Sequence, residues 1–383
     1  MRILVFNWQD TTNPLAGGAE VHLHNIFSRI ARRGHDVTLF CSSYPGAASE
    51  ETRDGIRIIR KGGRALFNVH VPLAYWRRFR REQFDVIVDD VNKIPFLTPL
   101  YVRRPLFGIM HHLFGRSIYL EANPIVATYV YVTERLGVWL YRLSGIPFFV
   151  VSPSTKDELM QHGFEESRLH LVHNCVDHTI HVPAPERRSP TPLIGIFGRL
   201  KKYKCVDQVL RALPTVLKQV PGARLVVVGD GDDRPRLERL TRELGLSQSV
   251  SFAGYVPEET KVEWLQKMWF GVTMSSKEGW GLTVLEANAC GTPVIAADVP
   301  GLRDAVKDGV TGVLTPFGDI AALAAKMTAL LQDEPRRTRL SGQAITWAGE
   351  FNWDHAAEKT LQALRAHAGL VDERHAGLHI PVK

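Results

Sequence analysis

The chain reads Ser275-Ser-Lys-Glu278-Gly-Trp-Gly281-Leu-Thr-Val-Leu-Glu286-Ala-Asn-Ala-Cys-Gly291 over its most informative stretch. This stretch follows a short apolar run that predicts a strand, and it opens a predicted helix that ends at Gly291. A glycine-bearing turn from strand to helix exposes backbone N–H groups and the positive end of the helix dipole, which together hold a phosphate. We therefore expect a phosphate-bearing ligand near the N–H groups of Gly281, Leu282 and Thr283.

Two glutamates in the same stretch extend this expectation to a sugar. Glu278 lies in the turn and Glu286 in the predicted helix, with seven residues between them. Because helical side chains lean toward the N-terminus of their helix, Glu286 would reach back toward a ligand at that end. Carboxylates are poor phosphate ligands but good acceptors for sugar hydroxyls. The alternative is a solvated Glu278 and a Glu286 on an exposed helix face.

A second group of candidates follows the predicted strand Leu193–Phe197. Arg199 and Lys204 come directly after this strand, and open α/β sheets bind ligands at the carboxyl ends of their strands. Two cations there could neutralise a departing diphosphate, the group on which charge builds during sugar transfer. The alternative is a solvated basic turn.

Short apolar strands alternate with amphipathic helices along the chain, which predicts parallel sheets with crossover helices. In the first half the pattern predicts a helix over Ala19–Arg33 and strands over Arg2–Trp8, Asp36–Cys41, Ile56–Arg60, Asp85–Asp89, Leu106–Met110, Phe148–Ser152 and Leu169–His173. In the second half it predicts a helix over Val206–Val220 and strands over Leu193–Phe197, Arg224–Val228, Val250–Phe252, Phe270–Met274 and Pro293–Ala297. The expected fold class is α/β, with two Rossmann-like, doubly wound domains.

The composition also places the domain boundary. Four prolines between Val182 and Pro192 favour an extended connector. We expect an N-terminal domain over 1–182, a linker over 183–192 and a C-terminal domain over 193–352. The remaining segment, 353–383, carries an amphipathic stretch that can pack back on the N-terminal domain, followed by a tail.

The N-terminal half offers two further candidates. Gly17 and Gly18 open the first predicted helix, where paired glycines allow close approach of an anion, although a purely structural loop is the alternative. His111 and His112 leave the carboxyl end of the strand Leu106–Met110 toward opposite faces, so one of them is structural.

These motifs together resemble the large retaining glycosyltransferase family 4, whose two-domain fold is called GT-B. The family's signature of two glutamates is matched by Glu278 and Glu286, and the following Ala-Cys-Gly-Thr-Pro-Val-Ile segment is similar too. Two positions depart from the family pattern. Cys205 stands in place of the glycine that follows the basic pair, and Cys175 stands in place of the glycine in the Asn-Gly-Val-Asp turn. The N-terminal half looks like that of an uncharacterised bacterial and archaeal branch.

The resemblance implies two domains that face each other across a cleft, and a role for each candidate. It places Glu278 at the transferred sugar, Glu286 on the ribose, and Arg199 and Lys204 on the diphosphate. It also implies that Gly17 and Gly18 face the donor across the cleft and that His111 hydrogen-bonds the sugar, His111 matching better than His112. We expect the base of the nucleotide near Tyr255 and Val256.

The expected activity is transfer of a sugar from a nucleotide-diphosphate sugar, with retention of configuration. A UDP-sugar is favoured over GDP-mannose, and the acceptor is a glycan, a lipid-linked acceptor or a small molecule. No cofactor is expected besides the nucleotide sugar, which is a co-substrate. No metal is expected, because Asp230-Gly-Asp232 is interpreted as a turn that caps the next helix instead of an Asp-x-Asp metal site. The rival functions are another GT-B enzyme, such as a nucleotide-sugar epimerase or a phosphorylase, and a non-catalytic nucleotide-sugar-binding subunit.

The composition indicates the expected cellular location and the classes of partner. The N-terminus lacks the pattern of a secretory leader, and the four cysteines form no C-x-x-C pair, so a cytoplasmic protein is expected. The net charge of +7 suits an anionic partner, but no aromatic and basic motif for nucleic acid is present.

One basic segment suggests a membrane contact. From Arg53 to Arg81 there are nine basic residues and one acidic residue. A predicted helix there would place the set Trp76, Arg77, Arg78, Phe79, Arg80 and Arg81 in the headgroups of an anionic membrane, at its cytoplasmic face. The alternative is that Trp76 and Phe79 pack into the core while the arginines are solvated.

Overall fold

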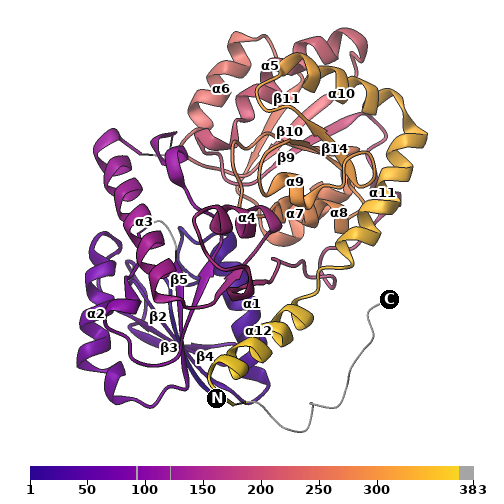
Figure 1. Ribbon diagram of the computed structural model, residues 1–383. Coiled ribbons are helices and arrows are strands. Elements are labelled where there is room, and N and C mark those ends of the chain that lie inside the picture. Colours follow the sequence, from indigo (N-terminus) through magenta and orange to yellow (C-terminus); the bar gives the residue numbers. More distant parts are fainter. Residues whose placement is uncertain (92–93, 121, 371–383) are drawn as a thin grey trace.

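The computed structural model describes residues 1–91, 94–120 and 122–370, and these form two α/β units, one above the other in Figure 1. The strands of the first unit are β1 (Arg2–Phe6), β2 (Asp36–Cys41), β3 (Glu50–Arg53), β4 (Ile56–Arg60), β5 (Val86–Val91), β6 (Leu106–Met110), β7 (Phe148–Val150) and β8 (Leu169–Leu171). Those of the second are β9 (Leu193–Phe197), β10 (Arg224–Val228), β11 (Val250–Gly254), β12 (Phe270–Thr273), β13 (Val294–Ala297) and β14 (Gly312–Thr315). The predicted linker lies in the connection from β8 to β9.

The strand orders are those of doubly wound sheets. The first sheet runs β3-β4-β2-β1-β5-β6-β7-β8 and the second β11-β10-β9-β12-β13-β14. All pairings are parallel except that of the edge strand β3 with β4. The order reverses beside β1 in the first sheet and beside β9 in the second, and ligands bind at such switch points. The predicted fold class of two Rossmann-like domains is confirmed.

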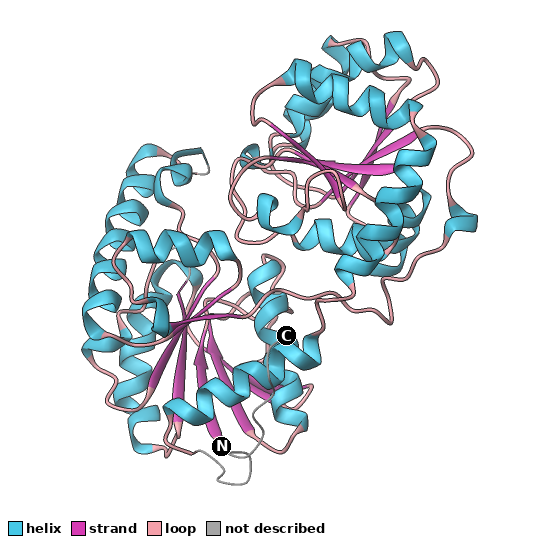
Figure 2. Cartoon of the chain, turned by 45° about the vertical axis from the view of Figure 1, so that its right-hand side comes forward, coloured by secondary structure: helices cyan, strands magenta, loops and turns pink. Residues whose placement is uncertain are grey.

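Two helix layers cover the first sheet. On one face, α1 (Gly18–Arg32) and α12 (Trp353–His367) share a core with Ile3 and Val5 of β1. On the other face, Leu4 and Phe6 pack beneath α2 (Phe67–Arg77), and Met110 of β6 packs beneath α3 (Pro124–Ser144). The shorter α4 (Pro153–Gln161) follows β7. Figure 2 shows the helices on both sides of each sheet.

The second sheet has its own apolar core and its own helix layers. Its helices are α5 (Val206–Gln219), α6 (Arg234–Glu243), α7 (Glu258–Lys267), α8 (Leu282–Ala289), α9 (Leu302–Ala305), α10 (Ile320–Gln332) and α11 (Glu334–Ala348). After α11 the chain returns to the first unit as α12, which lies beside α1 near the N-terminus (Figure 1). Arg29 of α1 contacts Asp354 of α12 at 3.1 Å, and Arg33 pairs with Glu358.

The helix predicted around residues 75–81 is partly wrong. Helix α2 ends at Arg77, and Arg78 (φ −125°, ψ −68°) redirects the chain into the short turn η2 (Phe79–Arg81). This turn sends Phe79 inward, where it is 1% exposed and packs against Phe6 and Phe40. Phe79 therefore cannot be part of a membrane contact, whereas Trp76 is 50% exposed. Across the part of the chain that the structure describes, none of the helices has the length and apolarity of a membrane span.

Candidate active site

The candidate site forms where loops of both domains meet at the switch points. The turn after β9 lines a pocket with Gly198, Arg199, Lys204 and Thr273. The Arg199 guanidinium donates from Nη1 to the carbonyl oxygen of Leu15, at 3.1 Å, in the loop after β1. A Cβ atom built on Gly17 would lie 2.1 Å from Nη2 of Arg199, so a larger residue there would require the guanidinium to move. The structure thus brings Arg199 together with Gly17, whereas a Cβ atom built on Gly18 would meet nothing within 4 Å.

Lys204, which lines this pocket, forms an ion pair with Glu278. The Nζ atom of Lys204 lies 2.5 Å from Oε1 of Glu278, and both side chains are 18% exposed. Burial acts to lower the pKa of Lys204, but the Glu278 carboxylate outweighs it and the pKa is raised. The amine therefore stays charged.

His111 lies against the loop that carries Glu278. A Cβ atom on Gly279 would lie 2.5 Å from the carbonyl oxygen of His111, so the two backbones are in close contact. Nε2 of His111 is 3.2 Å from Oδ1 of the fully buried Asp90, at the end of β5. Burial acts to lower the pKa of His111, yet Asp90 holds it above its usual value. His112 instead contacts the ring of Phe114.

Glu286 lies in a separate polar cluster. Lys261 of α7 contacts Glu286 at 3.1 Å and Glu258 at 2.7 Å, and Nε2 of His181 lies 3.1 Å from Glu258. Burial acts to lower the pKa of Lys261, but the two carboxylates raise it. His181, Glu258 and Glu286 bring potential metal ligands within 4.8 Å of one another, but the cation among them is Lys261.

The remaining donor-site candidates include the start of α8 and Tyr255. Gly281 directly precedes α8, and the N–H groups of Val284 and Leu285 bond back to its carbonyl oxygen. Thr283, in the first turn of α8 beside Leu282, lies 4.0 Å from a Cβ atom built on Gly198. Tyr255 follows the edge strand β11 and is 84% exposed, and among the contacts of the described residues none joins it to the pocket.

Two further segments have mainly local contacts. Val256 packs against the apolar cluster of β10 residues and Met268. Asp232 pairs with Lys201 at 2.8 Å and Asp230 with Arg234 at 3.3 Å, while the Asp230 side chain accepts from the N–H of Gly231. This turn leads into α6, which begins at Arg234.

Comparison with known proteins now identifies the family. The model of "Glycosyltransferase Family 4" matches residues 16–180, and that of "Glycosyl transferases group 1" matches residues 179–347. D-inositol 3-phosphate glycosyltransferase of Xylanimonas cellulosilytica is 34% identical over 391 residues, which cover 90% of this chain and 91% of the relative. The chain belongs to glycosyltransferase family 4.

Other relatives match more distantly or over shorter segments. The glycogen synthase of Mycobacterium tuberculosis is 26% identical, over 96% of this chain and 95% of that protein. D-inositol 3-phosphate glycosyltransferase of Nocardia farcinica is 37% identical over 46% of this chain, and the match spans only 40% of that relative.

Solved structures show that this family 4 chain has the GT-B fold. Sucrose-phosphate synthase from Thermosynechococcus elongatus matches with a TM-score of 0.81 at 21% identity, over 95% of this chain and 98% of that one. Anabaena Alr3699/HepE in complex with UDP-glucose matches with a TM-score of 0.75 at 19% identity, over 96% and 100%. At such identities the likeness concerns the fold.

Several residues that contact the candidate site residues of this family 4 chain were not predicted from the sequence. Asp90 was not singled out from the sequence, although its place at the end of β5, beside the switch point, could have done so. Its neighbour Asp89 accepts hydrogen bonds from Thr98 and Tyr141, and burial raises the pKa of Asp89 to about 7. Lys261 and His181 gave no signal, because their partners come from distant segments.

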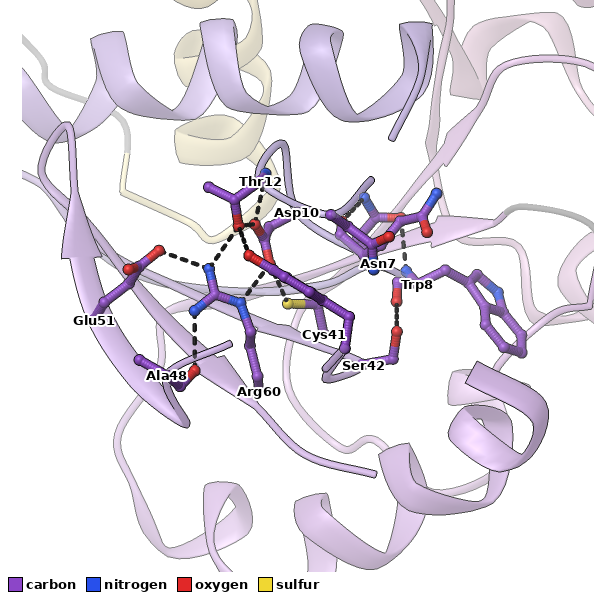
Figure 3. Close-up of polar contacts among 12 residues, drawn as sticks. Asn7, Trp8, Asp10, Thr12, Cys41, Ser42, Ala48, Glu51 and Arg60 are labelled. Atoms are coloured by element: carbon purple, nitrogen blue, oxygen red, sulfur yellow. Dashed lines mark hydrogen bonds and ion pairs between the residues drawn. The ribbon is translucent and has the colours of Figure 1, made fainter. Parts of the chain in front are cut away.

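A buried ion pair anchors the loop that carries Gly17 (Figure 3). Arg60, at the end of β4, contacts Asp10 at 2.6 Å and Glu51 at 2.6 Å, and it also donates to the carbonyl oxygen of Ala48. The Arg60 and Asp10 side chains are each 1% exposed. Asp10 also accepts the N–H of Thr12, so the pair fixes the backbone of the loop between β1 and α1.

Proposed function

We propose that this glycosyltransferase moves a sugar from a UDP-sugar to a hydroxyl acceptor with retention of anomeric configuration. The observation that carries the proposal is the Arg199, Lys204 and Glu278 cluster at the switch point of the second sheet. Two cations suit a diphosphate and a carboxylate suits sugar hydroxyls, so the cluster is suited to the part of a donor where the bond breaks.

The roles of the residues follow from their chemistry. Arg199 and Lys204 neutralise the charge that develops on the departing diphosphate, and the N–H groups of Gly281, Leu282 and Thr283 add to them. Glu278 accepts hydroxyls of the transferred sugar, and His111 donates to the same sugar. Glu286 holds the ribose.

In the proposed reaction the acceptor replaces the diphosphate on the transferred sugar. The acceptor oxygen bonds to the anomeric carbon on the face from which the diphosphate oxygen leaves, and that phosphate oxygen takes the acceptor proton. Gly17 and Gly18 close over the donor and exclude water, which would otherwise hydrolyse it. Tyr255 and Val256 lie toward the base.

Solved structures of the same fold support a nucleotide sugar with UDP as its carrier. Solved GT-B structures of the same fold include one in complex with UDP-glucose. The acceptor is proposed to be a glycan, a lipid-linked acceptor or a small molecule, and a relative at 34% identity is named for D-inositol 3-phosphate.

The test is incubation of the full chain with a panel of UDP-sugars and GDP-mannose, with detection of released nucleotide. Slow release of UDP from one sugar is expected even without acceptor, because water can replace it. An epimerase would convert the sugar, a phosphorylase would require inorganic phosphate, and a binding subunit would release nothing. Each of these three results contradicts the proposal.

A further inference from the structure

Helix α3 exposes an apolar stripe along its whole length. The stripe consists of six side chains that are each at least 47% exposed: Ile125, Tyr129, Val132, Leu136, Trp139 and Leu143. Their positions alternate in steps of four and three, so they lie on one side of the helix. The opposite side packs on the domain through Val138 and Tyr141. A surface helix normally presents a polar face to water, but this stripe of α3 is apolar.

The neighbouring helix has the same unusual outer side. Leu66, Val69, Leu73 and Trp76 are each at least 41% exposed, again in steps of three and four. The inner side of α2 packs on the sheet through Phe67 and Val71.

The two stripes belong to one layer, because α2 and α3 cover the same face of the first sheet. The segment between them joins them: Tyr101 contacts the Tyr75 ring of α2 at 5.5 Å, and Thr98 contacts Tyr141 of α3 at 3.5 Å. Exposed Leu97 and Leu100 lie on this segment. Figure 1 shows α2 and α3 on the left flank of the first unit, away from α12. We call the outer side of these two helices, of the flanking turns η1 (Arg64–Leu66) and η2, and of residues 97–104 the α2–α3 surface.

The charges at this surface are of one sign. Its exposed arginines are Arg64, Arg77, Arg80, Arg81, Arg103, Arg104, Arg135 and Arg142. Arg80 lies over the ring of Trp76, 4.6 Å from its centroid. The acidic side chain that the structure describes on α3 is Glu134, which is buried and accepts the N–H groups of Phe114 and Gly115.

This charge pattern indicates which kind of partner fits the α2–α3 surface. A second copy packed on the same surface would place arginines against arginines, with no exposed acidic group from the described part of α2 or α3 to pair them. An anionic bilayer satisfies both features: apolar side chains enter the acyl boundary, aromatic rings lie at headgroup depth, and arginines meet lipid phosphates. We propose that the α2–α3 surface docks this protein flat on an anionic lipid bilayer.

The surface leads to the candidate site. The turn η4 (Gly115–Leu120), just before α3, contacts the turn η7 (Lys202–Lys204), which carries Lys204. A bilayer under α3 would therefore lie close to the turn that carries Lys204, where it could present a lipid-linked acceptor. Docking itself does not depend on the proposed donor.

The test is sedimentation of the full chain with vesicles of phosphatidylcholine, with and without phosphatidylglycerol. Binding is expected only with phosphatidylglycerol and should weaken as salt increases. Replacing Arg135 and Arg142 by glutamine should lower the partition coefficient about thirtyfold, at roughly fivefold, or ~1 kcal/mol, per basic residue. The Leu136→Glu and Trp139→Glu double variant should lose binding, because charge replaces the groups that enter the bilayer.

Matched controls come from exposed residues of the other domain. The pair Arg211→Gln and Arg239→Gln should bind as the unaltered protein does, and so should Val310→Glu with Phe317→Glu. Thermal unfolding of every variant separates loss of docking from loss of folding.

Failure of the unaltered protein to bind anionic vesicles at low salt would overturn the proposal, as would equal losses in the control variants. A dimer that the Leu136→Glu and Trp139→Glu variant converts to a monomer, with vesicle binding unchanged, would make the surface a contact between copies instead. UDP binding, measured by calorimetry on the same variants, tests the donor proposal separately and should not change.

Discussion

Lys204 and Arg199 are the residues whose removal should affect transfer most. Their charges face the position proposed for the leaving diphosphate, and the loss of one such group typically raises the barrier by about 3 kcal/mol. Lys204→Ala and Arg199→Ala should therefore each lower kcat roughly a hundredfold, with a smaller change in the KM for the acceptor. The control is Lys202→Ala, which removes an exposed lysine from the same turn. Near-normal turnover by Lys204→Ala would show that the diphosphate binds elsewhere.

Glu286 should act on binding instead of on the chemical step. A ribose contact is present in both the ground state and the transition state, so Glu286→Ala should weaken UDP affinity by roughly tenfold or more. Calorimetry with UDP measures this directly. Glu259→Ala, an exposed change on α7 beside Glu258, is the control. If UDP binds the Glu286→Ala protein with unchanged affinity, the glutamate serves only to hold Lys261.

Cys205 occupies a backbone conformation that favours glycine. Its φ of +49° and ψ of +39° lie in the left-handed region, at the start of α5, which costs a residue with a side chain about 1 kcal/mol or more. Cys205→Gly should therefore stabilise the protein by up to about 1 kcal/mol, after the greater freedom of glycine in the unfolded chain is subtracted. Urea unfolding measures this, and Cys205→Ala, which keeps the Cβ atom, should bring no such gain.

At the scale of elements, the loop between β1 and α1 depends on the buried Asp10. Burial acts to raise the pKa of Asp10, but hydrogen bonds from Arg60 and Thr12 lower it to about 2. A carboxyl whose folded pKa lies below its unfolded value stabilises the fold above the unfolded value and loses that contribution as the pH falls toward about 2. Asp10→Asn should therefore cost about 3 kcal/mol at neutral pH, because it leaves Arg60 with one carboxylate.

The Asp10 prediction is checked by urea unfolding at neutral and acidic pH. Stability of the unaltered protein should fall more steeply than that of Asp10→Asn as the solution is acidified below about pH 4. Asp36→Asn, whose side chain is 82% exposed, is the control and should change little. Equal acid sensitivity of both variants and the unaltered protein would mean that the pair does not stabilise the loop.

The elements differ in how far the sequence predicts them. Five strands have the predicted bounds, among them Asp36–Cys41 and Leu193–Phe197, because buried parallel strands are short, apolar runs. The edge strand β3 (Glu50–Arg53) was missed, since three of its four residues are charged and only pairing with β4 reveals it. The predicted end of this helix was also wrong. The aromatic and basic residues beyond Arg77 continue a helical pattern in the sequence, but α2 ends at Arg77.

The residues of the candidate site also differ in how far the sequence predicts them. Residues that directly follow a strand, such as Arg199 and His111, could be placed from sequence, since the carboxyl ends of parallel strands meet at one edge. The contact of Asp90 with His111, and that of Lys261 with Glu286, could not, because each joins segments from different strands or helices. Motif spacing carries no information on such pairs.

At the scale of the whole molecule, α12 ties the end of the chain to the first domain. Its buried side chains, among them Trp353, Leu361 and Leu364, belong to the core beneath α1, and full burial of one such side chain contributes about 1.5–3 kcal/mol. A chain that ends at residue 352 should therefore lose more than about 5 kcal/mol from the N-terminal domain. Circular dichroism on heating measures the loss. A chain that ends at residue 370 keeps α12 and should unfold as the full chain does.

The packing of α12 on the first domain also affects when that domain can finish folding during synthesis. The N-terminal domain holds part of its core in a helix that is synthesised after the C-terminal domain, so the newly made N-terminal half must wait with an uncovered apolar face. At roughly 5–20 residues per second, that wait spans the synthesis of the entire C-terminal domain. During this interval the exposed apolar face is a binding site for chaperones. A product that ends before residue 353 keeps that face exposed.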